Sequence, residues 1–269
     1  VTEGMLQKGT SVGLPSEVAT AGSRAAANLW TKLSPEDLLA QARLAEALLR
    51  DGRAPEAVAN VVLPDSGSGP HWYLANAWLA RAEVAGGKPH SAKERLQRNA
   101  ANISVPVSAE NAQAGAVFAL AALDLFDADM ARQFVSSESG DALLSLVKGR
   151  LALIDGDLDT AKKELDRALK AGHEEATVWL AVARALGGQP RRALEMLDSA
   201  RSKGPELPWF LLVRGWLRMT EGSAAADEAL KQGLELAPYS PAAHYLLGIL
   251  DETSQNHDSA REHFIEASK

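Results

Sequence analysis

Cysteine is absent from this chain of 269 residues, which excludes disulfide scaffolds, cysteine zinc sites, iron–sulfur clusters and thiol nucleophiles. Proline and glycine, at 12 and 21 residues, are too few for a collagen-like or linker-like chain. No apolar run reaches the ~18 residues of a membrane helix, so we expect no membrane span in this chain. Basic residues number 28 against 35 acidic ones, and the net charge of −7 predicts no nucleic-acid partner.

Motifs of catalytic or metal chemistry are also missing. The segment Ser66–Gly69 lacks the Gly-Lys-Ser/Thr ending of a phosphate-binding loop, and the turn Asp155–Asp159 has Asp166 where a calcium loop has glutamate. None of the histidines shows the His-Glu-x-x-His spacing of a zinc site; they are His71, His90, His173, His244, His257 and His263. We therefore predict no enzyme, no metal and no cofactor.

Amphipathic helices fill most of the sequence. Ser34 precedes a proline and two acids, which predicts a helix that starts at Ser34 and ends at Asp51-Gly52. Further turn signals separate apolar stretches of helical period at Gly86-Gly87, Asp127, Asp155-Gly156-Asp157, Gly187-Gly188, Glu221-Gly222 and Ser254-Gln255-Asn256. No convincing stretch alternates with a period of two, so the sequence predicts seven helical pairs and no sheet.

A small residue recurs at a nearly fixed interval in the first helix of successive pairs. Gly115, Gly149, Ala183, Gly215 and Gly248 lie 34, 34, 32 and 33 residues apart. Twelve residues after Gly149 and after Gly248 stands an alanine, followed by a large apolar residue and a further alanine. This pattern resembles the tetratricopeptide repeat (TPR), in which the small residue lets paired helices approach and the large residue fills the gap between them. The residues assigned to repeat packing are Gly115, Gly149, Ala161, Trp179, Ala183, Ala193, Gly215, Gly248, Ala260 and Phe264.

The resemblance implies an all-α, right-handed superhelical solenoid of antiparallel helix pairs. We expect a flexible or partly helical segment over residues 1–33, degenerate repeats over 34–140, and four TPR repeats over 141–269. The apolar Phe264 and Ile265 near the end, with no polar capping helix after them, predict self-association through the C-terminal pair.

The resemblance also implies a non-catalytic adaptor whose first helices line a concave face and hold a peptide segment or helix of a partner protein. The residues expected on that face are Leu146, Arg150, Leu180, Arg184, Trp209, Leu212, Trp216, Tyr245 and Ile249. The same stripe also suits a core packed against the next repeat, since stripes of this kind are frequently buried.

Bacterial members of the resembled family assist assembly, secretion or motility machines, and the resemblance implies a similar setting here. The alternative is a regulatory or partner-recruiting arm of a larger membrane-anchored or enzymatic protein, which the missing initial methionine and the linker-like first 33 residues favour. We expect a cytoplasmic location, with a periplasmic or membrane-tethered one as the alternative.

Overall fold

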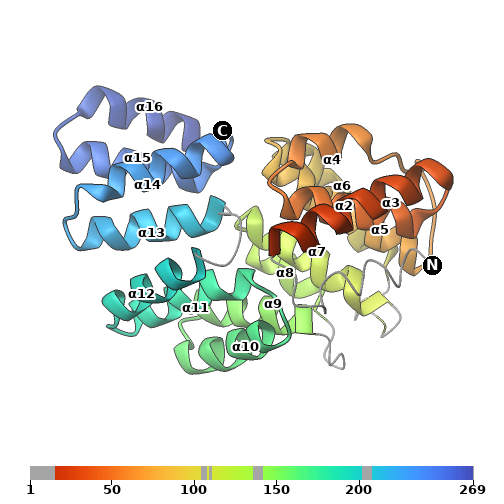
Figure 1. Cartoon of the computed structure of the whole chain (residues 1–269), viewed down its shortest axis with the longest axis horizontal. Coiled ribbons are helices and arrows are strands. Elements are labelled where there is room, and N and C mark those ends of the chain that lie inside the picture. The colour runs from red at the N-terminus through yellow and green to blue at the C-terminus, as the bar shows by residue number, and fades with distance from the viewer. Residues whose placement is uncertain (1–15, 104–107, 109–110, 136–141, 202–207, 269) are drawn as a thin grey trace. The chain divides into compact units, whose positions relative to one another are not determined.

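The structure is a computed structural model that describes residues 16–103, 108, 111–135, 142–201 and 208–268 (Figure 1). Within these ranges every regular element is a helix, and fifteen α-helices follow one another along the chain. Consecutive helices pack as antiparallel pairs, so the predicted all-α fold of seven helical pairs is confirmed.

The chain divides into two compact units, Val1–His173 and Glu174–Lys269. The first unit holds α2 (Ser16–Leu33), α3 (Leu38–Arg50), α4 (Ala54–Asn60), α5 (Pro70–Ala85), α6 (Pro89–Asn102), α7 (Ala112–Asp124), α8 (Ala128–Gln133), α9 (Ala142–Ile154) and α10 (Leu158–Lys170). The second unit holds α11 (Glu175–Leu186), α12 (Pro190–Arg201), α13 (Pro208–Thr220), α14 (Ala225–Leu236), α15 (Pro241–Thr253) and α16 (His257–Ala267). The predicted boundary between degenerate repeats (34–140) and regular repeats (141–269) stays a prediction.

The start of α3 differs from the predicted one. Asp37, rather than Ser34, is the N-cap, and its carboxylate accepts hydrogen bonds from the backbone N–H groups of Leu39 and Ala40 at 2.9 and 3.3 Å. The prediction at Ser34 was wrong because a second good capping residue stands three positions later. Ahead of this cap, α2 packs against α3, and Trp30 Nε1 donates a hydrogen bond to Asp37 Oδ2 at 2.9 Å. Residues 1–15 lie outside the described ranges.

The turns inside the seven pairs share one geometry. In each turn the backbone N–H of the residue after a left-handed position donates to the carbonyl five residues earlier, which ends the first helix in a Schellman motif. Gly156, with φ of 77°, is the left-handed residue between α9 and α10, and glycine adopts this conformation without a Cβ clash. Two turns place a larger residue there, Phe126 with φ of 60° and Gln255 with φ of 64°.

The packing role predicted for glycine in the first helices is visible at three pairs. A Cβ atom on Gly149 would lie 2.5 Å from Leu165 Cγ, and one on Gly215 would lie 2.6 Å from Leu230 Cγ. At the last pair, a Cβ on Gly248 would lie 2.6 Å from Phe264 Cε1. Hydrogen in place of a side chain therefore allows each pair of helices to close around one large residue of the second helix.

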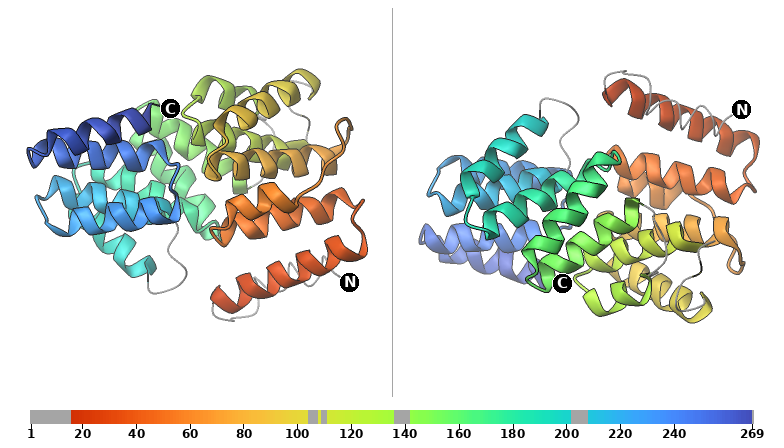
Figure 2. Two further views of the ribbon diagram at one scale, coloured as in Figure 1. Left: turned by 90° about the horizontal axis from the view of Figure 1, so that it is seen from above. Right: turned by 90° about the horizontal axis from the view of Figure 1, so that it is seen from below.

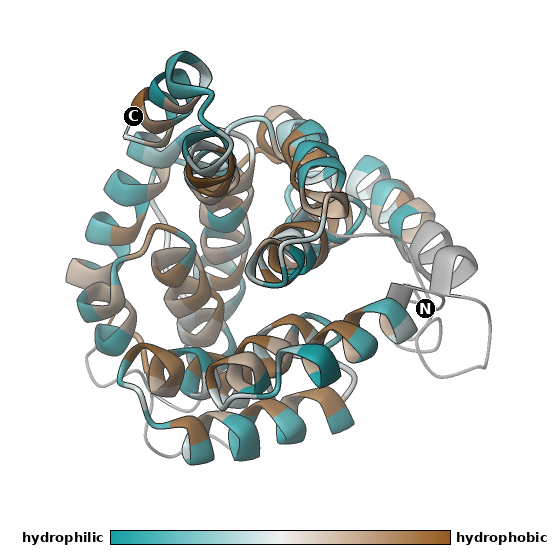
Figure 3. Cartoon of the chain, turned by 90° about the vertical axis from the view of Figure 1, so that its left-hand side faces the viewer, coloured by the Kyte–Doolittle hydropathy of each residue, from teal (hydrophilic) through white to brown (hydrophobic). Residues whose placement is uncertain are grey.

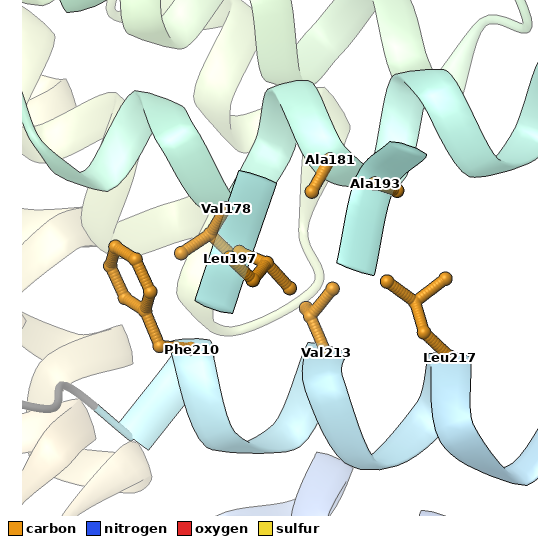
Figure 4. Packing of buried hydrophobic residues seen from close by; sticks show 7 residues of the cluster. All are labelled: Val178, Ala181, Ala193, Leu197, Phe210, Val213 and Leu217. Atoms are coloured by element: carbon orange, nitrogen blue, oxygen red, sulfur yellow. The ribbon is translucent and has the colours of Figure 1, made fainter. Parts of the chain in front are cut away.

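Successive pairs of the second unit are joined by apolar contacts. Val178 and Ala181 of α11 pack with Ala193 and Leu197 of α12, and Phe210, Val213 and Leu217 of α13 close the same cluster (Figure 4). The next cluster joins α13 and α14 to α15, and Figure 2 shows these C-terminal pairs lying side by side. Apolar and polar residues alternate along the helical ribbons in Figure 3, as helices with one buried side require.

Candidate partner-binding surface

In the first unit, the two residues expected on the partner-binding face are buried. Leu146 and Arg150 of α9 are 1% and 4% exposed. The Arg150 guanidinium donates from Nη1 to Asp124 Oδ1 at 2.8 Å, and Arg81 donates from Nε to Asp124 Oδ2, also at 2.8 Å. These charges therefore join the first helices of three successive pairs, α5, α7 and α9, and no face of Arg150 is presented to a partner.

Asp124 is held in its charged form by this arrangement. Burial by itself would raise the pKa of the Asp124 carboxyl, but the positive charges of Arg81 and Arg150 and their hydrogen bonds outweigh it and lower that pKa below its ordinary value. The buried carboxylate forms ion pairs with two guanidinium groups and so links three helices of the first unit. The sequence did not indicate this role, because its three members lie 26 and 43 residues apart.

In the second unit, the exposure of the expected residues depends on their position in the first helix. Leu180 and Leu212, three residues before the small residue of their pairs, are 4% and 1% exposed. Leu212 lies in a cluster with Ala243 and Leu247 of α15, so the following pair covers it. Tyr245 occupies the same position in the last pair and is exposed.

The residues directly after the small residue remain partly exposed in the second unit. They are Arg184 on α11, Trp216 on α13 and Ile249 on α15, and we call this set the first-helix stripe. Equivalent positions of successive repeats lie on one side of the repeat array, which makes the stripe a row of side chains across three pairs. Within the described part of the chain, Arg184 makes no ion pair.

Two further tryptophans lie on the same first helices. The rings of Trp179 on α11 and Trp209 on α13 are tilted against each other by 51° with centroids 5.3 Å apart, and both side chains are half-buried. Trp179 Nε1 donates to Glu175 Oε1 at 3.3 Å. Sequence reasoning placed Trp179 in the repeat core alone, whereas half-burial leaves part of its ring accessible beside Trp209. The contact between these two indole rings was not predictable from the sequence, because they lie on different helices.

Among the described residues, no group of three or more His, Asp or Glu side chains is arranged to hold a metal ion. No helix in the described ranges is long and apolar enough to cross a membrane. The half-buried tryptophans of α11 and α13, together with the partly exposed Arg184, are the candidate surface of the second unit.

Comparisons with known proteins agree with this architecture. No protein-family model and no curated protein sequence matches the chain. Among solved structures, it is similar to human IFIT1 in a dimer with PPP-AAAA, at a TM-score of 0.55 and 18% identity, over 93% of this chain and 64% of that one. Another similar structure is a tetratricopeptide repeat protein from Parabacteroides merdae, at a TM-score of 0.49 and 12% identity, over 100% of this chain and 99% of that one.

The similarity to IFIT1, the period near 34 residues and the glycine-centred packing of three pairs together decide the fold. The chain has the TPR fold. At these identities the comparisons show the fold of this TPR chain alone.

Proposed function

We propose that this chain is a non-catalytic adaptor that holds a peptide segment or a helix of a partner protein on the first-helix stripe of its second unit. The observation that carries the proposal is the partial exposure of Arg184, Trp216 and Ile249 at equivalent positions of three successive pairs. Trp and Arg dominate binding free energy in protein interfaces, and here they stand in one row on rigid helices.

Binding on this surface follows from the chemistry of its residues. The exposed parts of Trp216 and Ile249 offer apolar area, and the planar guanidinium of Arg184 offers donors that match a carboxylate on the ligand. Trp179 and Trp209 extend the apolar area at the side of α11 and α13. An extended or helical segment with apolar side chains and one acidic side chain fits this arrangement.

The experiment is a quantitative affinity purification from native extract with three forms of the chain. The wild type is compared with an Arg184→Ala, Trp216→Ala double variant and with a control, Arg192→Ala, Tyr239→Ala. Arg192 and Tyr239 are exposed residues of the same unit outside the stripe, so the control removes the same kinds of side chain. We expect a specific protein that the wild type and the control retain and that the double variant loses by at least about tenfold.

Equal recovery of the same protein by all three forms would move the binding surface elsewhere. Circular dichroism of each variant must show unchanged helicity, because Trp216 also packs against the cluster between α11 and α13. Nucleic acid is not part of the proposal, because the chain carries seven net negative charges.

The proposal also concerns the larger assembly or polypeptide in which the adaptor works. The sequence resemblance favours a bacterial assembly, secretion or motility machine, and the alternative is a recruiting arm of a larger membrane-anchored or enzymatic protein. Identification of the protein retained by the wild type distinguishes these two, because the first predicts a machine component in another polypeptide and the second a substrate or regulator of the attached domain.

A further inference from the structure

Two histidines from different helices of the last pair face each other. His244 on α15 and His263 on α16 have their Nδ1 atoms 3.0 Å apart, with ring centroids 5.3 Å apart and ring planes tilted by 41°. Both side chains are half-buried. Two ring nitrogens at this distance form a hydrogen bond when one of them carries a proton and the other keeps its lone pair. The protonation of the two rings therefore decides whether this contact attracts or repels.

The second nitrogen of each ring lies near an acceptor. His244 Nε2 is 3.3 Å from the backbone carbonyl oxygen of Pro238, and His263 Nε2 is 3.8 Å from Asp251 Oδ2. Ser259 Oγ donates to the same carboxylate oxygen at 2.6 Å and so holds Asp251 in place. Because both acceptors attract an N–H group, these surroundings favour a proton on Nε2 of each ring.

The four ring nitrogens thus call for three protons, one on each Nε2 and one between the two Nδ1 atoms. Two neutral imidazole rings carry one proton each, which leaves either two Nδ1 lone pairs facing each other or an Nε2 lone pair facing an acceptor. One additional proton supplies all three positions and adds a single positive charge near Asp251. A further proton brings two N–H groups and two positive charges face to face.

Helices α13 and α14 pack against α15, and α14 places a cation near the carboxylate of this group. Lys231 Nζ donates to Asp227 Oδ2 at 2.9 Å. This hydrogen bond and the charge of Asp227, with a contribution from the charge of Asp251, raise the pKa of Lys231. Asp251 therefore already has one cation in its vicinity, which makes a second positive charge on the histidine pair less favourable.

Other charged groups of α13, α15 and α16 have different surroundings. Arg214 and Arg218 of α13 each lie 3.9 Å from Asp198 of α12. At the start of α16, His257 Nδ1 is 3.1 Å from Glu252 Oε2, and both residues are exposed. The remaining charged residues of α16 are also exposed; they are Asp258, Arg261, Glu262 and Glu266. His257 is the one other histidine of these two helices, so it is the natural control for the pair.

We propose that His244 and His263 bind one shared proton between their Nδ1 atoms and thereby form a pH-sensitive link between α15 and α16. A second additional proton, taken up in acid, breaks this link. When α16 is detached the two histidines are independent and bind that proton more readily, so the attachment of α16 weakens as the pH falls. This inference does not rest on the proposed binding of a partner by the first-helix stripe.

Hydrogen exchange of backbone amides in the full chain measures how firmly α16 is attached. Exchange is followed at about pH 7.5 and about pH 4.5, a range that spans the titration of histidine while carboxylates of ordinary acidity stay mostly ionised. Protection factors, which are corrected for the intrinsic pH dependence of exchange, are compared between α16 and α13. We expect protection of α16 to fall in acid by at least about tenfold more than protection of α13.

Variants assign the acid effect to the pair. His244→Phe keeps a ring of similar size and removes both nitrogens, so α16 should lose no more protection in acid than α13 does. His263→Phe is the second variant and has the same expected result. His257→Phe is the matched control on α16, and it should keep the acid loss of the wild type. A wild-type chain without the acid loss, or an undiminished loss in the two pair variants, would overturn the proposal.

Nuclear magnetic resonance of the imidazole nitrogens counts the protons directly. We expect the rings of His244 and His263 to take up two protons in two separate steps, because the second proton meets the charge of the first. The exposed His71 should titrate in one step, and so should His244 in the His263→Phe variant. Two rings that each titrate in one step at the pH found for His71 would also overturn the proposal.

Discussion

At the level of single residues, the packing of the helical pairs depends on glycines at positions where a larger side chain would not fit. The Leu165 side chain packs directly against the backbone at Gly149, and the same arrangement joins Leu230 to Gly215. In each pair, a Cβ atom added at the glycine would lie within 2.6 Å of the leucine side chain. A substitution at either glycine should therefore disturb the packing of both helices of its pair.

We predict that Gly149→Ala lowers the free energy of unfolding. An added methyl group in a filled space costs roughly 1–3 kcal/mol, and the better helix propensity of alanine returns about 1 kcal/mol, which leaves a net loss of about 1 kcal/mol. Urea denaturation measures the loss. A double variant with Leu165→Ala is the control, because alanine at position 149 should cost less when Leu165 is shortened. A stability equal to or above that of the wild type would contradict the close contact.

The turns offer a second prediction at this scale, in the opposite direction. Phe126 is 67% exposed and has a φ of 60°, a left-handed conformation that costs a residue with a Cβ roughly 1–2 kcal/mol. We expect Phe126→Gly to raise the free energy of unfolding by about 1 kcal/mol, because the strain disappears and little burial is lost. Thermal or urea unfolding measures the gain. A loss of stability would mean that the Phe126 side chain contributes more by packing than its exposure indicates.

At the scale of the element, a charged group joins the first helices of the first unit. Asp124 at the end of α7 accepts from Arg81 of α5 and from Arg150 of α9. Removing one partner of a buried ion pair leaves the other charges unpaired, which typically costs about 3–5 kcal/mol. The three helices are thus held by electrostatics as well as by apolar contact.

We predict that Asp124→Asn lowers the free energy of unfolding by about 3 kcal/mol at pH 7. The pKa of Asp124 is lowered in the folded chain, so the stabilisation is complete above the unfolded value of about 3.9 and is lost as the pH falls through the lower folded value. The difference between wild type and variant should therefore shrink in strongly acidic solution. Urea unfolding at several pH values measures it, with the exposed Asp129→Asn as control.

These elements also show what the sequence could and could not predict. The paired helices, the turns and the glycine contacts follow from local patterns with a period near 34 residues, and the sequence was sufficient for them. Which residues of the first helices stay exposed was not predictable in the same way. Leu212 and Trp216 differ by one helical turn, and only the placement of α15 decides that the first is buried and the second partly exposed. The partnership of Arg150 with Asp124 likewise requires the three-dimensional register of α7 and α9.

At the scale of the whole molecule, the chain consists of two compact units with their own cores. The second unit contains complete clusters between α11, α12 and α13 and between α13, α14 and α15. Repeat arrays draw their stability from contacts between neighbours, so a unit that holds several neighbouring pairs can fold by itself.

We predict that residues 174–269, expressed alone, are helical and unfold in a cooperative transition. The reason is that every residue of the two clusters named above belongs to this fragment. Circular dichroism during thermal unfolding measures both properties. A fragment with little helicity, or one that loses helicity gradually without a transition, would show that the second unit depends on the first.

Site-specific photo-crosslinking tests whether the first-helix stripe of the second unit contacts a partner protein. A photoreactive phenylalanine analogue replaces Trp216 in one form of the chain and Arg192 in another, and both are irradiated in native extract. We expect one specific protein adduct at position 216 and none at position 192, because Trp216 lies on the stripe and Arg192 lies outside it. Adducts of the same protein and yield at both positions, or an adduct at 192 alone, would contradict it.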